Sequence, residues 1–194
     1  TERDHVQLVG ICGGYQMLGQ HLKDPFAVEA NQIQEARGLG WLPLSTTFLE
    51  HKQTVRASGR VQQRHPIRLY GEQDSVDSMP VNGYESHMGV TECHDAKQVT
   101  ALFEIAHPGG QPFQEGWGSP NGKVWGTYLH GLFESDQFRR SWLNGLRQGK
   151  GLAPLQETYS AHERKEMEFD RVAESLRSAL DMKRVYEIMG IQYG

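Results

Sequence analysis

Short apolar runs bounded by glycines and polar turns set the pattern of the first part of the chain. Residues 5–9 form a β-branched run that ends at Gly10, and this run predicts a buried strand. The apolar positions then follow helical spacing from residue 14 to Leu22. We expect this helix to stop at Pro25, because proline cannot continue it.

Further apolar runs predict the remaining strands. They cover residues 38–50, 54–62, 80–91, 100–106 and 124–129. A polar turn is expected to join the first two of these strands. The glycine-rich stretch 108–122 predicts a loop.

Two amphipathic segments predict helices in the last third of the chain. Residues 136–148 place apolar side chains at helical spacing. Ser160 and Glu163 have the spacing of a capping box, and one helix is expected from there to Gly190. Its apolar face is formed by Phe169, Val172, Leu176 and Leu180. Strands mixed with helices indicate an α/β domain.

Composition narrows the class of protein. Of the 194 residues, 37% are hydrophobic and 23% are charged, which suits a packed core. The formal net charge of −4 argues against a nucleic-acid-binding surface. No apolar run approaches the roughly 18 to 20 residues that cross a membrane, and no leader opens the chain. A cytoplasmic protein that acts without nucleic acid or membrane is expected.

Cys12 is the first candidate for chemistry. It lies between the predicted strand and the predicted helix, with Gly10 and Gly14 two residues to either side. This is the G-x-nucleophile-x-G pattern with cysteine in place of serine. The amide of Gly13 could then point at an oxyanion. A buried cysteine between glycines that serve close packing would leave the same pattern. Cys93, which follows a strand-like segment, is expected to be a small apolar filler.

His130 is the candidate base for this cysteine. It ends the predicted strand 124–129, and the carboxyl ends of strands in an α/β sheet form the ligand crevice. A histidine that is merely hydrogen-bonded in a strand-to-helix loop is the alternative. Most of the other histidines are expected at the surface, namely His21, His51, His65, His94, His107 and His162.

A polar cluster between glycines suggests a wall of the site. It consists of Tyr84, Glu85 and His87, and either a substrate contact or an edge strand would explain it. A metal site made of Glu85, His87 and His130 is rejected, because no metal-ligand spacing supports it.

Three segments together resemble class I, triad-type glutamine amidotransferases, and within them the cobyric acid synthase branch. They are residues 10–19 around the cysteine, residues 83–89 in the middle, and residues 126–133 around the histidine. The resemblance covers residues 6–148. It implies an open, mostly parallel sheet flanked by helices, of the flavodoxin-like type. The whole chain, 1–194, is then expected to be a fragment of the amidotransferase domain, with 160–190 as a helical extension.

The resemblance also assigns roles to residues. It implies that Cys12 is the nucleophile, that His130 is its base, and that Gln16 contacts the glutamine substrate. The family usually places a glutamate two residues after its histidine, but Leu132 occupies that position here. Glu134 and Glu85 are the remaining candidates for orienting the imidazole.

The activity that the resemblance implies is glutamine hydrolysis that supplies ammonia for an amidation. ATP and Mg²⁺ would be used in a synthetase domain that precedes this part, and no cofactor is expected within it. The acceptor would be the side-chain carboxylates of cobyrinic acid a,c-diamide, a corrinoid bound elsewhere, giving cobyric acid. The family's second oxyanion loop precedes the nucleophile strand and is expected to be missing here, so the chain alone should have weak or no activity.

Three other functions fit parts of the pattern. An amidotransferase subunit that acts with a ligase on a cell-wall lipid intermediate shares the same motifs. A stand-alone cysteine hydrolase could use the same turn without a synthetase. A regulatory domain could keep the fold without activity, although the presence of both Cys12 and His130 argues against it.

Overall fold

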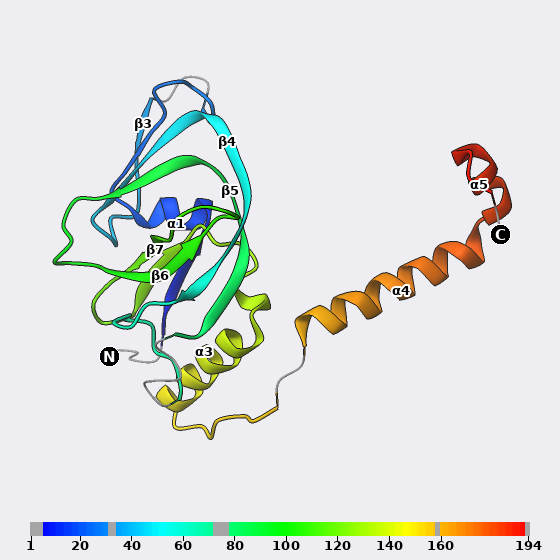
Figure 1. The fold of residues 1–194 in the computed structure, drawn as a ribbon. Coiled ribbons are helices and arrows are strands. Elements are labelled where there is room, and N and C mark those ends of the chain that lie inside the picture. The colour runs from blue at the N-terminus through cyan, green and yellow to red at the C-terminus, as the bar shows by residue number, and fades with distance from the viewer. Residues whose placement is uncertain (1–5, 31–33, 72–77, 158–159, 193–194) are drawn as a thin grey trace. The chain divides into compact units, whose positions relative to one another are not determined.

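A computed structural model of the protein describes residues 6–30, 34–71, 78–157 and 160–192 (Figure 1). The chain divides into two compact units, Thr1–Thr158 and Tyr159–Gly194. The first unit contains the sheet and every candidate site residue. The second unit consists of helices.

Within the described residues, the first unit is built on a sheet of eight strands. Their order is β1-β8-β7-β6-β4-β2-β3, and β5 also pairs with β4. The strands are β1 (Leu8–Ile11), β2 (His21–Lys23), β3 (Glu35–Arg37), β4 (Leu44–Val61), β5 (Pro80–Cys93), β6 (Thr100–Ala106), β7 (Phe113–Gly118) and β8 (Val124–Thr127). Its helices are α1 (Gly13–Leu18), the 3₁₀ turn η1 (Leu132–Glu134) and α3 (Asp136–Gly149).

The predicted open α/β sheet flanked by helices is confirmed, and its pairing is mixed. Strand β1 runs parallel to β8 and β2 runs parallel to β4, whereas the other pairings are antiparallel. The expectation of a mostly parallel sheet therefore does not describe these strands. The physical reason lies in the connections, because β6, β7 and β8 are joined by short loops and parallel neighbours need a longer crossover.

Two apolar clusters form the core of the first unit. One joins Phe138 of α3 to strand residues, and the other joins Tyr15 of α1 to a second set. Neighbouring residues of β8 contribute to different clusters: Val124 belongs to the cluster of α1 and Trp125 to the cluster of α3. Successive side chains of a strand point to opposite faces, so β8 is covered on both sides.

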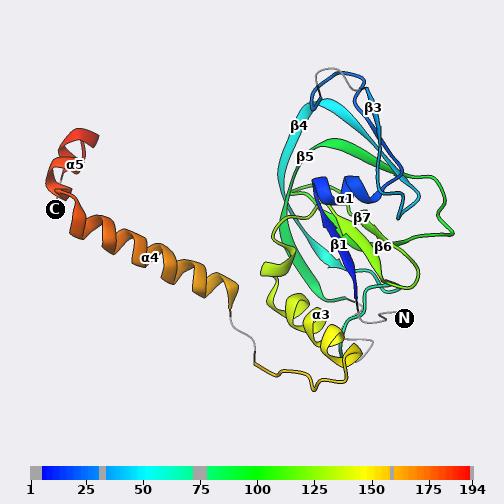
Figure 2. The same ribbon diagram turned by 180° about the vertical axis from the view of Figure 1, so that it is seen from behind.

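The helix after Cys12 is shorter than its apolar spacing predicted. It ends at Leu18, and Leu22 lies in β2, where it pairs with Thr46 of β4. Gly19 ends the helix with extended backbone, and a Cβ there would lie 2.8 Å from the carbonyl oxygen of Leu44. Close contact with β4 thus leaves no room for another helical turn. Figure 2 shows β1 running into this short helix.

Two further expectations for the sheet are corrected. The strands predicted over residues 38–50 and 54–62 are one strand, β4, whose pairing with β5 is irregular between Phe48 and Gln53. The polar residues there suggested a turn but continue the strand. The predicted loop 108–122 contains β7, in which Gly116 has a φ of 70°. Such a glycine within a strand weakened its apolar pattern.

The second unit contains two helices in place of the one predicted. Helix α4 (Ala161–Ala179) starts as expected, since the Ser160 side chain accepts a hydrogen bond of 3.1 Å from the amide of Glu163. Asp181 caps a new helix, α5 (Met182–Met189), which ends at Gly190 as predicted. A capping aspartate favours a fresh helix start, so the chain breaks at Leu180. None of the described helices is long and apolar enough to cross a membrane.

Candidate functional site

Cys12 occupies the sharp turn that its glycines predicted. Its backbone has a φ of 52° and a ψ of −114°, which is unusual for a residue with a Cβ. A Cβ at Gly10 would lie 2.7 Å from the backbone of Gly14, so this glycine permits the close approach of β1 and α1. A Cβ at Gly14 would meet nothing within 4 Å, so of the two glycines only Gly10 is required for close packing.

His130 lies just beyond the carboxyl end of β8. Its backbone forms an isolated antiparallel bridge with Tyr84 of β5, with hydrogen bonds of 2.8 and 3.0 Å. Its ring stacks on the Tyr84 ring, with centroids 4.9 Å apart. The Nε2 atom of His130 is buried and has no hydrogen-bond partner among the described residues.

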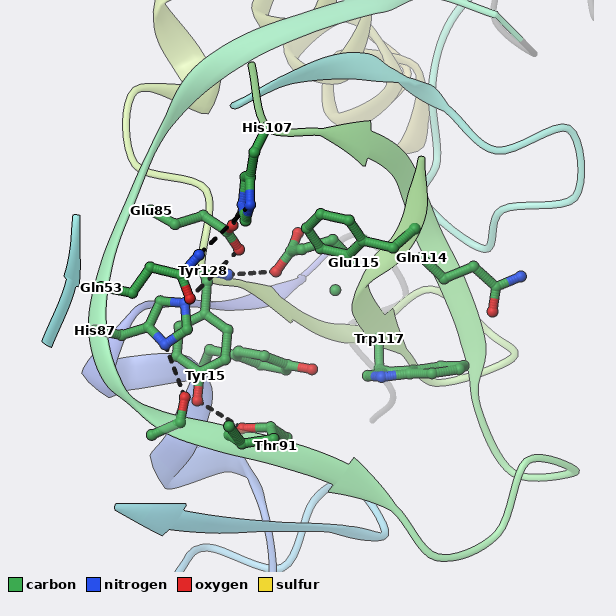
Figure 3. Close-up of a pocket in the computed structure, with 14 residues that line it drawn as sticks. Tyr15, Gln53, Glu85, His87, Thr91, His107, Gln114, Glu115, Trp117 and Tyr128 are labelled. Atoms are coloured by element: carbon green, nitrogen blue, oxygen red, sulfur yellow. Dashed lines mark hydrogen bonds and ion pairs between the residues drawn. The ribbon is translucent and has the colours of Figure 1, made fainter. Parts of the chain in front are cut away.

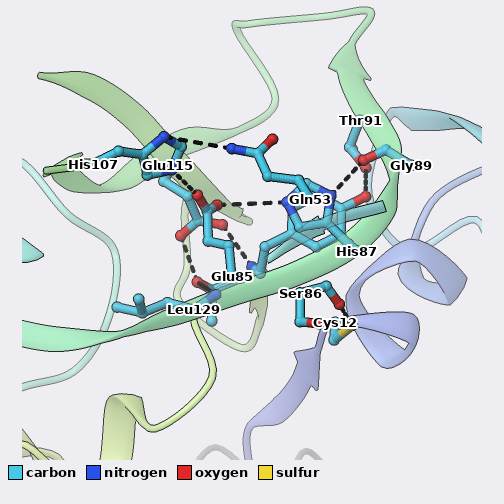
Figure 4. Close-up of polar contacts among 12 residues, drawn as sticks. Cys12, Gln53, Glu85, Ser86, His87, Gly89, Thr91, His107, Glu115 and Leu129 are labelled. Atoms are coloured by element: carbon cyan, nitrogen blue, oxygen red, sulfur yellow. Dashed lines mark hydrogen bonds and ion pairs between the residues drawn. The ribbon is translucent and has the colours of Figure 1, made fainter. Parts of the chain in front are cut away.

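Strand β5 brings Cys12 and His130 to one edge of the sheet. The Sγ atom of Cys12 lies 3.5 Å from the carbonyl oxygen of Ser86. Figure 4 shows this contact between the start of α1 and β5. Tyr84 directs its backbone N–H and C=O toward His130, and backbone groups two residues apart in a strand point to the same edge. Cys12 and His130 therefore contact two residues of β5, Ser86 and Tyr84, that lie about 7 Å apart along the strand.

The parallel pair of β1 and β8 accounts for this meeting. Ile11 pairs with Thr127, and the amide of Cys12 donates a hydrogen bond of 2.9 Å to the carbonyl oxygen of Thr127. Both chains thus leave the sheet at the same level, one into α1 and the other toward His130. This agrees with the expectation that strand ends place the two residues on one edge.

The middle motif is divided between the two faces of β5. Tyr84 is 46% exposed and meets His130, whereas Glu85 is only 3% exposed. His87 stacks on the ring of Tyr128 with centroids 3.8 Å apart, and its Nδ1 atom donates a hydrogen bond of 2.7 Å to the carbonyl oxygen of Gly89. Tyr84 is thus separated from Glu85 and His87, which lie in a buried network.

His107 completes this network, although the sequence placed it at the surface. It is half-buried, and its Nε2 atom donates a hydrogen bond to the carboxylate of Glu85. Burial raises the pKa of Glu85, but hydrogen bonds from His87 and His107 together with their charge bring it below its ordinary value. His107 follows a predicted strand among polar residues, and nothing in that pattern marked it as a partner of Glu85.

Glu115 is a second buried carboxylate that the sequence did not single out. One of its oxygens accepts a hydrogen bond of 2.6 Å from the amide of Tyr128, and the other accepts one from the hydroxyl of Thr127. Burial raises the pKa of Glu115 to about 7, and the negative charge of Glu85 adds to the shift. It was missed because the glycine-rich stretch around it was interpreted as a loop, although Phe113 and Trp117, two residues to either side, were a usable strand signal.

Gln16 is buried in α1, four residues after Cys12. Its Nε2 atom donates a hydrogen bond of 3.2 Å to the Tyr128 hydroxyl, which shares a second one of 2.6 Å with the hydroxyl of Thr91. Burial raises the pKa of Tyr128, so the phenol stays protonated and available to donate. Gly13 is exposed at the start of α1.

Glu134 lies away from the imidazole interactions. It is exposed, and among the described residues no hydrogen bond or ion pair joins it to His130. Glu85, the other candidate, bonds to His107. The orientation of His130 in this structure rests on the Tyr84 ring and the backbone bridge.

A cavity of about 240 Å³ lies beside this network (Figure 3). Its wall combines the two buried carboxylates with histidine and aromatic side chains, among them Glu85, Glu115, His87, His107, Tyr128 and Trp117. Within the described part of the chain, no group of three or more acidic, histidine or cysteine side chains is arranged to hold a metal ion.

A strained cysteine between a strand and a helix, with a histidine after the neighbouring parallel strand, defines an α/β domain with a nucleophile elbow. Residues 1–138 match the family described as the CobB/CobQ-like glutamine amidotransferase domain. The chain belongs to this family.

Curated relatives extend the match over nearly the whole chain. The chain is 39% identical over 184 residues to cobyric acid synthase of Thermoanaerobacter sp. (strain X514), covering 94% of the chain and 35% of that protein. It is 38% identical over 189 residues to cobyric acid synthase of Salmonella arizonae, covering 97% of the chain and 35% of the relative. The corresponding protein of Klebsiella pneumoniae subsp. pneumoniae is 41% identical over 184 residues. The chain thus spans about a third of the length of these relatives.

Proposed function

We propose that this chain hydrolyses glutamine and supplies the ammonia for an ATP-dependent amidation that yields cobyric acid. Membership of the amidotransferase family and the names of the curated relatives support this function. The acceptor would be the side-chain carboxylates of cobyrinic acid a,c-diamide. The relatives are about three times as long as the chain, so ATP, Mg²⁺ and the corrinoid would bind in a synthetase part outside these residues.

The chemistry would be carried by Cys12 and His130. The Cys12 sulfur attacks the side-chain amide carbon of glutamine, and His130 protonates the nitrogen as the C–N bond breaks and ammonia leaves. A water molecule activated by His130 then cleaves the glutamyl thioester and releases glutamate. The observation that supports this pair most strongly is the shared edge of β5, which Cys12 meets at Ser86 and His130 meets at Tyr84.

Two neighbours of the elbow would bind the substrate. The amide of Gly13 follows the nucleophile and would donate to the oxyanion, as the residue after a nucleophile does in this kind of turn. Gln16 would contact the glutamine, held in place by Tyr128. A second oxyanion donor is required for full rate, and we expect the chain alone to hydrolyse glutamine slowly.

The test compares nitrogen sources in the full-length protein that carries this chain. We expect Cys12→Ala to abolish amidation with glutamine and to leave amidation with ammonia intact. Cys93→Ala is the matched control, because Cys93 is the other cysteine of the sequence and should matter for neither nitrogen source. A glutamine-analogue electrophile should label Cys12 and not Cys93, as read by peptide mass spectrometry. Equal loss of both activities in Cys12→Ala, or labelling at Cys93 instead, would contradict the proposal.

A further inference from the structure

Glu115 stands where β7 and β8 separate. The described pairing of these strands covers Trp117 with Gly126 and Gly118 with Trp125. Beyond this point the carboxylate of Glu115 accepts hydrogen bonds from the amide of Tyr128 and from the hydroxyl of Thr127. A side chain thus replaces the backbone bonds that would have continued the strand pairing.

Thr127 links Glu115 to the backbone at Leu129 and to the backbone of Cys12. Its hydroxyl oxygen accepts a hydrogen bond of 3.0 Å from the amide of Leu129, the residue before His130. Its carbonyl oxygen accepts the bond of 2.9 Å from the amide of Cys12. One buried carboxylate therefore fixes the backbone that holds both the cysteine and the histidine.

We propose that Glu115 is a positioning residue for glutamine hydrolysis, which holds Cys12 and His130 in register through Thr127. The inference rests on the proposed function, since it assumes that these two residues react with glutamine. Glu115 itself touches neither side chain in the described contacts, and its effect passes through the backbone of residues 127–129. Displacement of a catalytic group by about 1 Å can lower a rate about 10²-fold.

The two hydrogen bonds of the Glu115 carboxylate determine which side chains can replace it. Both oxygens of Glu115 are used, one for each partner. A glutamine side chain has the same length, and its oxygen can accept from Tyr128 while its NH₂ group donates to the Thr127 hydroxyl. An alanine leaves the amide of Tyr128 without its partner. The conservative variant should therefore rescue what the alanine variant loses.

The experiment uses the full-length protein with glutamine and with ammonia as nitrogen source. We expect Glu115→Ala to lower the glutamine-dependent kcat about 10²-fold, with a smaller effect on KM and none on the ammonia-dependent rate. The rate at which a glutamine-analogue electrophile labels Cys12 should fall in parallel. Glu115→Gln should retain most of both rates.

Asn144→Ala provides the matched control for lost stability. Asn144 is also buried and also bonds through its side chain to backbone, with 2.9 Å bonds to the amide and the carbonyl of Leu155, but it lies in α3. The Asn144→Ala substitution should reduce the free energy of unfolding without changing the labelling rate of Cys12. Loss of labelling in Asn144→Ala equal to that in Glu115→Ala would overturn the positioning role, as would a wild-type labelling rate in Glu115→Ala.

A second pair of variants decides the matter if Glu115→Ala does not fold. Thr127→Ser keeps the hydroxyl that links Glu115 to Leu129, whereas Thr127→Val removes it. We expect the valine variant to label slowly and the serine variant to label near the wild-type rate, and equal rates would overturn the inference. Labelling of wild-type Cys12 separates the two proposals: without it the proposed function fails, and with it only the role of Glu115 is in question.

Discussion

The imidazole ring of His130 lies flat on the phenol ring of Tyr84, with centroids 4.9 Å apart and ring planes inclined by 8°. The two residues also exchange backbone hydrogen bonds in both directions. A catalytic histidine is commonly oriented by a carboxylate. Within the described residues, this aromatic neighbour is what fixes the plane of the His130 ring.

Tyr84 should therefore affect the reaction through its ring and not through its hydroxyl. Stacked aromatic pairs contribute about 0.5–1.5 kcal/mol, so Tyr84→Ala is expected to lower the glutamine-dependent kcat by up to about tenfold. Tyr84→Phe keeps the ring and should keep the rate. Steady-state glutaminase assays of the two variants check this, and an equal loss in both would show that the hydroxyl acts in the reaction.

Gly10 and Gly14 should respond differently to the same substitution. A methyl group at Gly10 would lie 2.7 Å from the backbone of Gly14, and crowding of this kind destabilises by roughly 1–3 kcal/mol. A methyl group at Gly14 meets nothing within 4 Å, and alanine favours the helix by about 0.5–1 kcal/mol. Denaturant unfolding of Gly10→Ala and Gly14→Ala should give opposite signs. A destabilised Gly14→Ala would contradict the open space at this position.

Part of the fold could be predicted from the sequence because it depends on local pattern. The strands β5, β6 and β8 and the helix α3 follow from alternating or helical apolar spacing. The short helix α1 does not, because Leu22 continues the helical spacing while contact between Gly19 and β4 ends the helix. This tertiary contact outweighed the local apolar spacing. It could not be predicted from the sequence, because no local pattern shows that β4 lies against Gly19.

The candidate site divides in the same way. Cys12 and His130 could be found because glycines and strand ends mark them locally, and the structure places both against β5. Glu115 and His107 were missed, because strand pairing and not a local pattern brings them to their partners: Glu115 bonds to Thr127, and His107 bonds to Glu85. Buried polar networks depend on which strands become neighbours, and here the sheet is mixed where a mostly parallel one was expected.

The backbone of Cys12 should be relieved by glycine. A residue with a Cβ at positive φ is strained by about 1–3 kcal/mol, and glycine adopts such backbone freely. Cys12→Gly is expected to be more stable than Cys12→Ala, although neither should hydrolyse glutamine. At Cys93, which ends β5 with a negative φ, the order should be reversed. Thermal unfolding of the four variants checks both orders, and the same order at both positions would argue against strain at the elbow.

The Tyr128 hydroxyl should matter for substrate binding more than for turnover. It accepts from Gln16 and is linked to Thr91, so Tyr128→Phe leaves the buried amide of Gln16 without this partner. The expected loss in the free energy of unfolding is about 1–3 kcal/mol, with a rise in the KM for glutamine that exceeds the fall in kcat. Tyr70→Phe is the control, since the described bonds of Tyr70 use its backbone. A fall in kcat at unchanged KM would place Gln16 outside substrate binding.

Glu115 should make the protein less stable as the pH rises. Its pKa is about 7 in the fold and lies near 4.5 in the unfolded chain, so the folded state holds the extra proton between these values. The free energy of unfolding therefore falls from about pH 4.5 to pH 7 and is flat above this window, with a total contribution of roughly 3 kcal/mol. Glu115→Gln cannot ionise and removes this contribution. Relative to the wild type, we expect the variant to gain stability between pH 5 and pH 8 in urea unfolding experiments, and a difference that stays constant with pH would mean that Glu115 is ionised in the fold at both ends of this range.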